Sequence, residues 1–167
     1  LDFPPENGGI QNYLYGIVRH AYGAGDFVIA GPLPRSRARY YEDLATPVRR
    51  VSYPCARQHK KIALIGMVLP LLCLRYRHPK DLIVECGNVY AAALPWALSH
   101  FVRLPYRVYA YGTELLPLKR RSLKAVILRG ILKRAERLYS LGSYTSQLLR
   151  ECGIQGEVEV VPPRIML

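Results

Sequence analysis

The feature that most constrains the fold is the alternation of short apolar runs with longer amphipathic segments along the chain. The short runs are typical of buried strands, and the longer segments carry apolar residues at helical spacing. The predicted strands are 27–30, 49–53, 81–86, 106–110, 138–141 and 157–161, and the predicted helices are 10–21, 62–75, 89–102, 122–137 and 145–152. Such alternation favours right-handed βαβ units around a parallel sheet. The predicted fold class is therefore α/β, a Rossmann-like doubly wound parallel sheet.

Length and charge set the organisation of the chain. Its 167 residues are 50% hydrophobic and carry 24 basic against 12 acidic residues, a net charge of +12. This suits one globular domain, which we predict at residues 1–163 with most of its first strand absent. Residues 164–167 follow the rigid pair Pro162-Pro163 and are expected to begin a linker. The positive charge favours an acidic partner, which is nucleic acid, a phosphorylated small molecule or an anionic membrane.

Two further features bear on compartment. The longest apolar run, residues 62–74, contains Gly66 and Pro70 and is shorter than the roughly 20 residues that span a bilayer. No Cys or His spacing typical of a metal site occurs, so the four cysteines are expected to be buried free thiols and no metal is expected. We predict a cytoplasmic protein without a transmembrane helix.

The candidate ligand site consists of loops that follow strands, because ligands of open α/β sheets bind at the carboxyl ends of the strands. Gly8 and Gly9 precede the first helix, where backbone N–H groups attract phosphate, with a plain tight turn as the alternative. Glu114 could bind sugar hydroxyls or move a proton, with a solvated carboxylate as the alternative. Ser143 is a candidate N-cap whose hydroxyl could also face a ligand. The residues singled out in the later loops are Asn88, Tyr111, Gly112, Thr113, Glu114 and Ser143.

The predicted helix 122–137 belongs to the most basic part of the chain. Eight basic residues and one acid lie between Lys119 and Arg137. Arg129, Lys133 and Arg137 recur every four residues and are predicted to form one stripe opposite an apolar arc. Such a helix favours an anionic membrane or nucleic acid, with a solvated face as the alternative. Because no nucleic-acid reading motif accompanies it, we expect contact with a membrane rather than with nucleic acid.

In their order and spacing, these segments resemble the N-terminal domain of the retaining glycosyltransferases of family 4, which have the two-domain GT-B architecture. The segments that carry the resemblance are Phe3-Pro4-Pro5-Glu6-Asn7-Gly8-Gly9-Ile10-Gln11, Tyr111-Gly112-Thr113-Glu114, Ala135 to Leu141 with Ser143-Tyr144-Thr145, and Val158-Glu159-Val160-Val161-Pro162-Pro163. One departure concerns the chemistry. Many relatives have His where this chain has Tyr111, so the resemblance assigns no catalytic residue.

The resemblance implies transfer of a sugar from a nucleotide-sugar to a glycan or lipid-linked acceptor, with retained anomeric configuration and no obligatory metal or other cofactor. It implies that Gly8 and Gly9 face the donor phosphates and that residues 111–114 lie beside the reacting sugar. The donor-binding C-terminal domain would lie outside this chain, so the chain alone is expected to be inactive. We expect peripheral association with the inner face of a membrane. The alternative is a non-catalytic basic Rossmann-like module that binds nucleic acid or another anionic partner.

Overall fold

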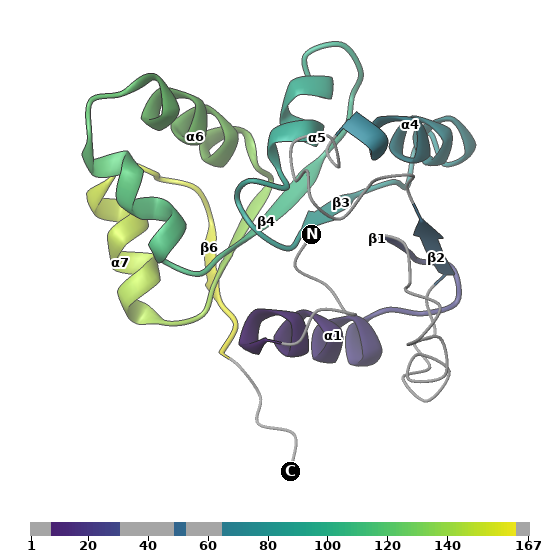
Figure 1. The fold of residues 1–167 in the computed structure, drawn as a ribbon, viewed down its shortest axis with the longest axis horizontal. Helices are drawn as coiled ribbons and strands as arrows, with labels where there is room; N and C mark the ends of the chain where they lie inside the picture. The colour runs from purple at the N-terminus through teal and green to yellow at the C-terminus, as the bar shows by residue number, and fades with distance from the viewer. Residues whose placement is uncertain (1–7, 31–48, 53–64, 163–167) are drawn as a thin grey trace. The chain divides into compact units, whose positions relative to one another are not determined.

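The computed structural model describes residues 8–30, 49–52 and 65–162 (Figure 1). The chain divides into two compact units, residues 1–78 and 79–167. The domain predicted at residues 1–163 spans both of them. Among the described residues, unit 1 has a sheet of two strands and unit 2 a sheet of four. The predicted linker at 164–167 lies outside the described residues.

Unit 1 has the two predicted strands, with a described helix before and after them. Its elements are α1 (Gly9–Ala21), β1 (Phe27–Ala30), β2 (Arg49–Ser52) and α4 (Val68–Arg77). The strands β1 and β2 pair in parallel. Pro70 lies in the first turn of α4, where its missing N–H leaves no helical hydrogen bond unmade.

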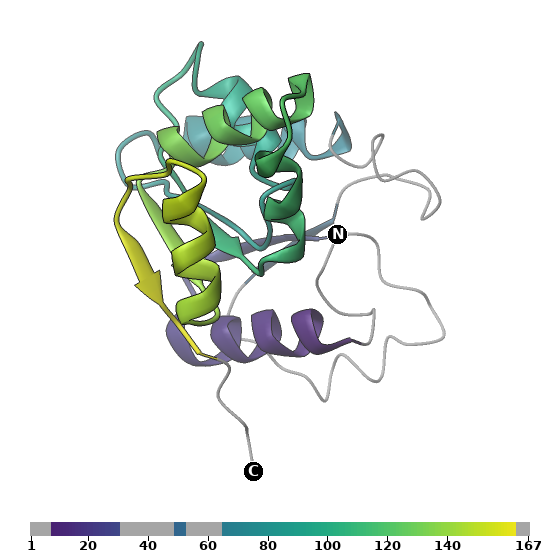
Figure 2. The same ribbon diagram turned by 90° about the vertical axis from the view of Figure 1, so that its left-hand side faces the viewer.

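Unit 2 is an α/β unit built on a parallel sheet with the strand order β3-β4-β5-β6. Its elements are β3 (Val84–Cys86), α5 (Ala93–Leu98), β4 (Tyr106–Ala110), the 3₁₀ helix η2 (Thr113–Lys119), α6 (Leu123–Arg134), β5 (Arg137–Ser140), α7 (Ser143–Glu151) and β6 (Val158–Val160). Each strand pairs with the next along the chain. Because right-handed crossovers that advance in one direction place their helices on one side, the helices of unit 2 share a face of the sheet. Figure 2 shows α7 alongside β6.

The core of unit 2 lies between the sheet and these helices. Tyr106, Val108 and Ala110 of β4 face the helices, whereas Arg107 and Tyr109 between them face the other side, as expected for a period of two. The core residues from the other elements are Cys86, Val89, Ala92, Leu115, Leu118, Leu128, Ile131, Leu132, Leu138, Leu148, Leu149 and Ile154. The face of the sheet toward the helices is therefore apolar, and the opposite face carries charged and aromatic side chains.

Two predicted helices are too long. Helix 89–102 is reduced to α5, which begins at Ala93 and has Pro95 in its first turn. Helix 122–137 ends at Arg134, and Arg137 opens β5 instead. The strand forms there because the Glu136 N–H donates to the Tyr106 carbonyl at 2.9 Å and Arg137 pairs with Arg107 of β4. The prediction that Arg137 shares a helical stripe with Arg129 and Lys133 was therefore wrong.

The cysteines and the helices bear on the other sequence expectations. Cys86 is buried and Cys152 is half-buried, but Cys73 is exposed, so the prediction of buried thiols was wrong for Cys73. Cys55 lies outside the described residues. In the part of the chain that the structure describes, no helix has both the length and the apolar character needed to cross a bilayer.

Tyr106 ties the sheet to the end of α6, and we expect Tyr106→Phe to lower the free energy of unfolding by about 1–2 kcal/mol. The side chain is 1% exposed, and its hydroxyl donates to the Ile131 carbonyl at 2.7 Å. That carbonyl belongs to the last turn of the helix, where intrahelical donors run out. Phenylalanine would leave it buried without this donor. Urea denaturation of the two proteins measures the difference, and equal midpoints and slopes would contradict it.

Candidate functional site

The candidate site lies at the carboxyl ends of β3, β4 and β5. Because these strands are parallel and adjacent, the loops that follow them emerge at the same edge of the sheet. The predicted residues of those loops are Asn88 after β3, Tyr111, Gly112, Thr113 and Glu114 after β4, and Ser143 after β5. The structure therefore brings these six to one edge of unit 2.

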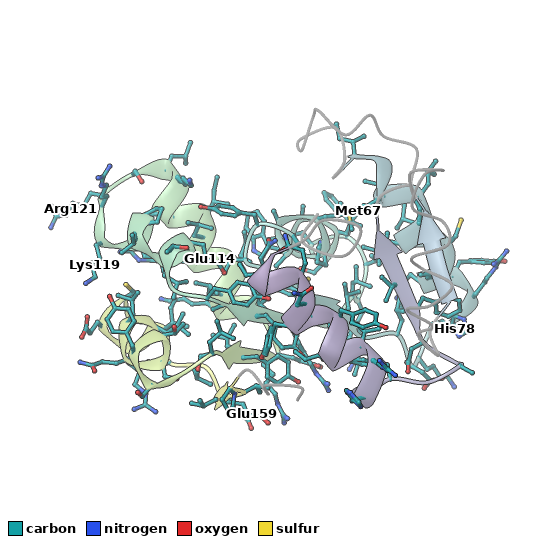
Figure 3. The ribbon with its side chains drawn as sticks, turned by 60° about the horizontal axis from the view of Figure 1, so that its bottom comes forward. Met67, His78, Glu114, Lys119, Arg121 and Glu159 are labelled. Carbon is teal, nitrogen blue, oxygen red and sulfur yellow. The ribbon has the colours of Figure 1, made fainter. Side chains whose placement is uncertain are left out.

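Glu114 joins two of the loops. Its Oε1 accepts hydrogen bonds from the Val89 N–H and from the Tyr111 N–H, both at 3.4 Å. The side chain is half-buried and belongs to the first turn of η2; Figure 3 labels it. Val89 and Glu114 are 25 residues apart, so the carboxylate connects the loop after β3 with the loop after β4. It is a bonded group at the rim of the sheet rather than a solvated surface carboxylate.

Gly112 gives the loop after β4 its shape. Its φ is +111°, in the region that favours glycine, and it is the N-cap of η2. A Cβ built at this position would lie 3.4 Å from the Thr145 Oγ1 of α7. The loop after β4 therefore approaches the first turn of α7 closely. Thr113, which follows, is exposed.

Asn88 makes a hydrogen bond within its own turn, and Ser143 does not cap the helix that it begins. Asn88 is buried, and its Oδ1 accepts from the Ala91 N–H at 2.7 Å, which stabilises the turn before α5. The prediction of Ser143 as an N-cap was wrong, because Ser143 is the first residue of α7 and Gly142 occupies the N-cap. Within the described residues no side chain caps this helix. The exposed Ser143 is thus placed at an open helix start beside the other loops.

Sequence reasoning missed a polar network on the face of the sheet opposite the helices. Arg107 donates to Glu85 Oε1 at 3.2 Å, and the Tyr109 hydroxyl donates to Glu85 Oε2 at 3.0 Å. Tyr109 stacks on Tyr139 with ring centroids 4.6 Å apart. Burial raises the pKa of Tyr139, with the Glu85 charge acting in the same direction. The alternation of Arg107 and Tyr109 with apolar residues was the available sequence signal.

Gly8 and Gly9 belong to unit 1. Gly8 is the extended N-cap of α1, and the Gln11 side-chain Oε1 lies where a Cβ on Gly8 would sit. Gly9 is the first helical residue, and no described atom lies within 4 Å of a Cβ built there. Neither lies in the left-handed region of φ that favours glycine. Their backbone conformation therefore does not itself demand glycine, and their role toward phosphate stays a prediction.

The three basic residues predicted as a stripe have separate surroundings. Arg129 is half-buried and donates to the Leu118 carbonyl at 2.6 Å. Arg137, on β5, pairs with Glu159 at 3.3 Å and with Glu157 at 3.5 Å. Lys133 is exposed on α6. These residues therefore do not make a common surface for an anionic partner.

Searches of protein-family models and of curated protein sequences give no match for this chain. Among the described residues, no group of three His, Cys, Asp or Glu side chains is arranged to hold a metal ion.

Proposed function

We propose that this chain is the acceptor-side, N-terminal domain of a retaining glycosyltransferase with GT-B architecture. The complete enzyme would transfer a sugar from a nucleotide-sugar to a glycan or lipid-linked acceptor, as a peripheral protein at a membrane surface. The observation that carries the proposal is the meeting of the loops after β3 and β4 on the Glu114 carboxylate at the carboxyl edge of a parallel sheet. This edge is where α/β sheets bind their ligands.

The chemistry of this edge suits a sugar. Sugar hydroxyls both donate and accept hydrogen bonds, and the edge offers the carboxylate of Glu114 together with the exposed hydroxyls of Thr113 and Ser143. The Glu114 carboxylate accepts hydrogen bonds from sugar hydroxyls, and its hydrogen bonds from the Val89 and Tyr111 N–H groups keep the two loops in place. Tyr111 occupies the position of the family's His. A phenol with a pKa of about 10 is a poor proton acceptor at neutral pH, so we assign Tyr111 to binding rather than to proton transfer.

The donor phosphates would be bound by the other predicted element, the start of α1. Its first turn contains no acidic residue, and no described side chain caps it. Its backbone N–H groups are thus suited to an anion. In this proposal Gly8 and Gly9 face the donor phosphates, and a C-terminal domain outside this chain holds most of the nucleotide.

A turnover assay tests the proposal. The natural protein that contains this chain is incubated with membranes and a panel of nucleotide-sugars, and release of the nucleoside diphosphate is measured. We expect release with at least one donor, and none from residues 1–167 alone, because most donor contacts lie elsewhere. Turnover by the 167-residue chain would overturn the division of roles between two domains. Absence of turnover by the natural protein with every donor would count against the glycosyltransferase proposal itself.

A further inference from the structure

Helix α6 has a second apolar face that is not buried in the core of unit 2. Ala125, Leu128 and Leu132 are buried on its inner side. On the outer side, Leu123, Val126 and Ile127 follow one another at the spacing i, i+3, i+4 and are 77%, 62% and 39% exposed. A helix of a soluble domain ordinarily turns polar residues to this side. The outer side of α6 therefore has the composition of a contact surface.

Exposed basic residues lie before, between and after these three side chains in the sequence. These basic residues are Arg120, Arg121, Lys124, Lys133 and Arg134, and residues 115–135 include no acidic residue. Figure 3 shows Lys119, the last residue of η2, and Arg121, in the turn before α6, lying away from Glu114. Lys119 is paired with Glu151 at 3.7 Å, so we do not count it. We call Arg120, Arg121, Leu123, Lys124, Val126 and Ile127 the α6 surface.

Contacts within unit 2 hold the α6 surface in shape. Arg129 donates to the Leu118 carbonyl at 2.6 Å and so attaches η2 to α6. The Ser122 Oγ accepts from the Ala125 N–H at 3.2 Å and caps the helix. Lys124 Nζ lies 5.1 Å from the centre of the Tyr90 ring, a cation–π contact. The basic and apolar side chains are thus presented on a fixed scaffold.

We propose that the α6 surface docks on an anionic lipid bilayer. Leu123, Val126 and Ile127 enter the interface between headgroups and acyl chains, and the basic residues contact lipid phosphates. This inference rests on the surface alone and does not require sugar transfer. It also deepens the proposed function, because η2 begins at Thr113 and Glu114 and leads directly into α6. A docked unit would hold the candidate site near a lipid-linked acceptor.

Charge and side-chain type favour a bilayer over the two other possible occupants. A two-fold dimer through this surface would bring Arg120 and Arg121 of one copy toward those of the other, and like charges oppose such contact. Nucleic acid would engage the basic residues, but single strands are held by stacking on aromatic side chains, and the exposed apolar residues of α6 are aliphatic. Of these three occupants, a lipid surface is the one that contacts both the basic and the aliphatic side chains.

Co-sedimentation with vesicles tests the proposal. The chain is mixed with phosphatidylcholine vesicles and with vesicles that also contain phosphatidylglycerol, and we expect binding to the anionic vesicles, weakened by salt. Arg120→Glu/Arg121→Glu should lower binding by about tenfold or more. Leu123→Ser/Val126→Ser, which keeps the charge, should lower it about tenfold through lost apolar burial. Arg77→Glu/Arg150→Glu makes the same charge change at exposed positions elsewhere and should bind more tightly than Arg120→Glu/Arg121→Glu.

The outcomes separate the possible occupants. Equal binding by all variants, or absence of binding by the parent chain, would overturn the proposal. Loss on charge reversal with full binding by Leu123→Ser/Val126→Ser would overturn it too, since the apolar residues would then play no part. A dimer in sedimentation velocity that Leu123→Ser abolishes would assign the surface to a second copy. Circular dichroism of each variant checks the fold, and vesicle binding without sugar transfer would leave only the glycosyltransferase proposal in question.

Discussion

Glu114→Gln should lower kcat/KM for sugar transfer by the natural protein about a hundredfold while the fold is kept. Glutamine retains an oxygen that can accept from the Val89 and Tyr111 N–H groups, so the two loops stay joined. The substitution removes the negative charge. A charged carboxylate accepts stronger hydrogen bonds from sugar hydroxyls than a neutral amide does, so sugar binding is weakened. The assay uses the nucleotide-sugar that gives turnover, and urea denaturation of both proteins measures the free energy of unfolding.

A second carboxylate provides the control for Glu114. Glu151 is exposed at the end of α7, and Glu151→Gln should leave kcat/KM unchanged. If Glu114→Gln transferred sugar at the parent rate, the side chain would only hold the loops together. If transfer fell only in proportion to a loss of folded protein, the conclusion would again be that Glu114 holds the loops together and does not bind sugar.

Gly112→Val should lower the free energy of unfolding by about 3 kcal/mol. The backbone at this position has a φ of +111°, which a β-branched residue adopts only with strain. The added Cβ would also lie 3.4 Å from Thr145 Oγ1, so the valine methyl groups would crowd the first turn of α7. Urea denaturation of the parent and variant chains measures the loss.

Two other glycines of unit 2 provide control substitutions that separate backbone strain from side-chain crowding. Gly153 has a φ of +76° with no described atom within 4 Å of an added Cβ, so Gly153→Ala should cost only about 1 kcal/mol. Gly142 is extended and equally open, and Gly142→Ser should be neutral or stabilising because serine is a good N-cap. A Gly112→Val chain as stable as the Gly142→Ser chain would contradict the close approach of the β4 loop to α7.

The strands were predictable because their signal is local. The run Tyr106 to Ala110 matches β4 at both ends, since apolar and β-branched residues there are bounded by Pro105 and by a turn. The end of α6 was not predictable in this way. Basic and apolar periodicity continues through Ala135, and pairing with β4 across the sheet decides that Arg137 is a strand residue.

The candidate site was predictable in its position but not in its contacts. Glu114 could be singled out because it follows a strand, a property that topology assigns to the ligand edge. Its contact with Val89 spans 25 residues, and nothing in the local sequence of either segment encodes it. The network around Glu85 was missed for the same reason, because its partners Arg107 and Tyr109 lie on the neighbouring strand. The apolar outer side of α6 was not predicted. The spacing of apolar residues in the sequence shows where they lie along a helix, but it does not show which of them are buried in the core.

Nuclear magnetic resonance of the isotope-labelled chain shows whether the carboxyl edge of the unit 2 sheet binds sugar. The chain is titrated with mono- and oligosaccharides and with nucleotide-sugars, and the backbone amide shifts are followed. We expect changes concentrated at Val89, Tyr111, Thr113 and Ser143, and weaker changes in Glu114→Gln. Amide shifts that stay unchanged at high millimolar sugar, or that change only on the opposite face around Glu85, would contradict it.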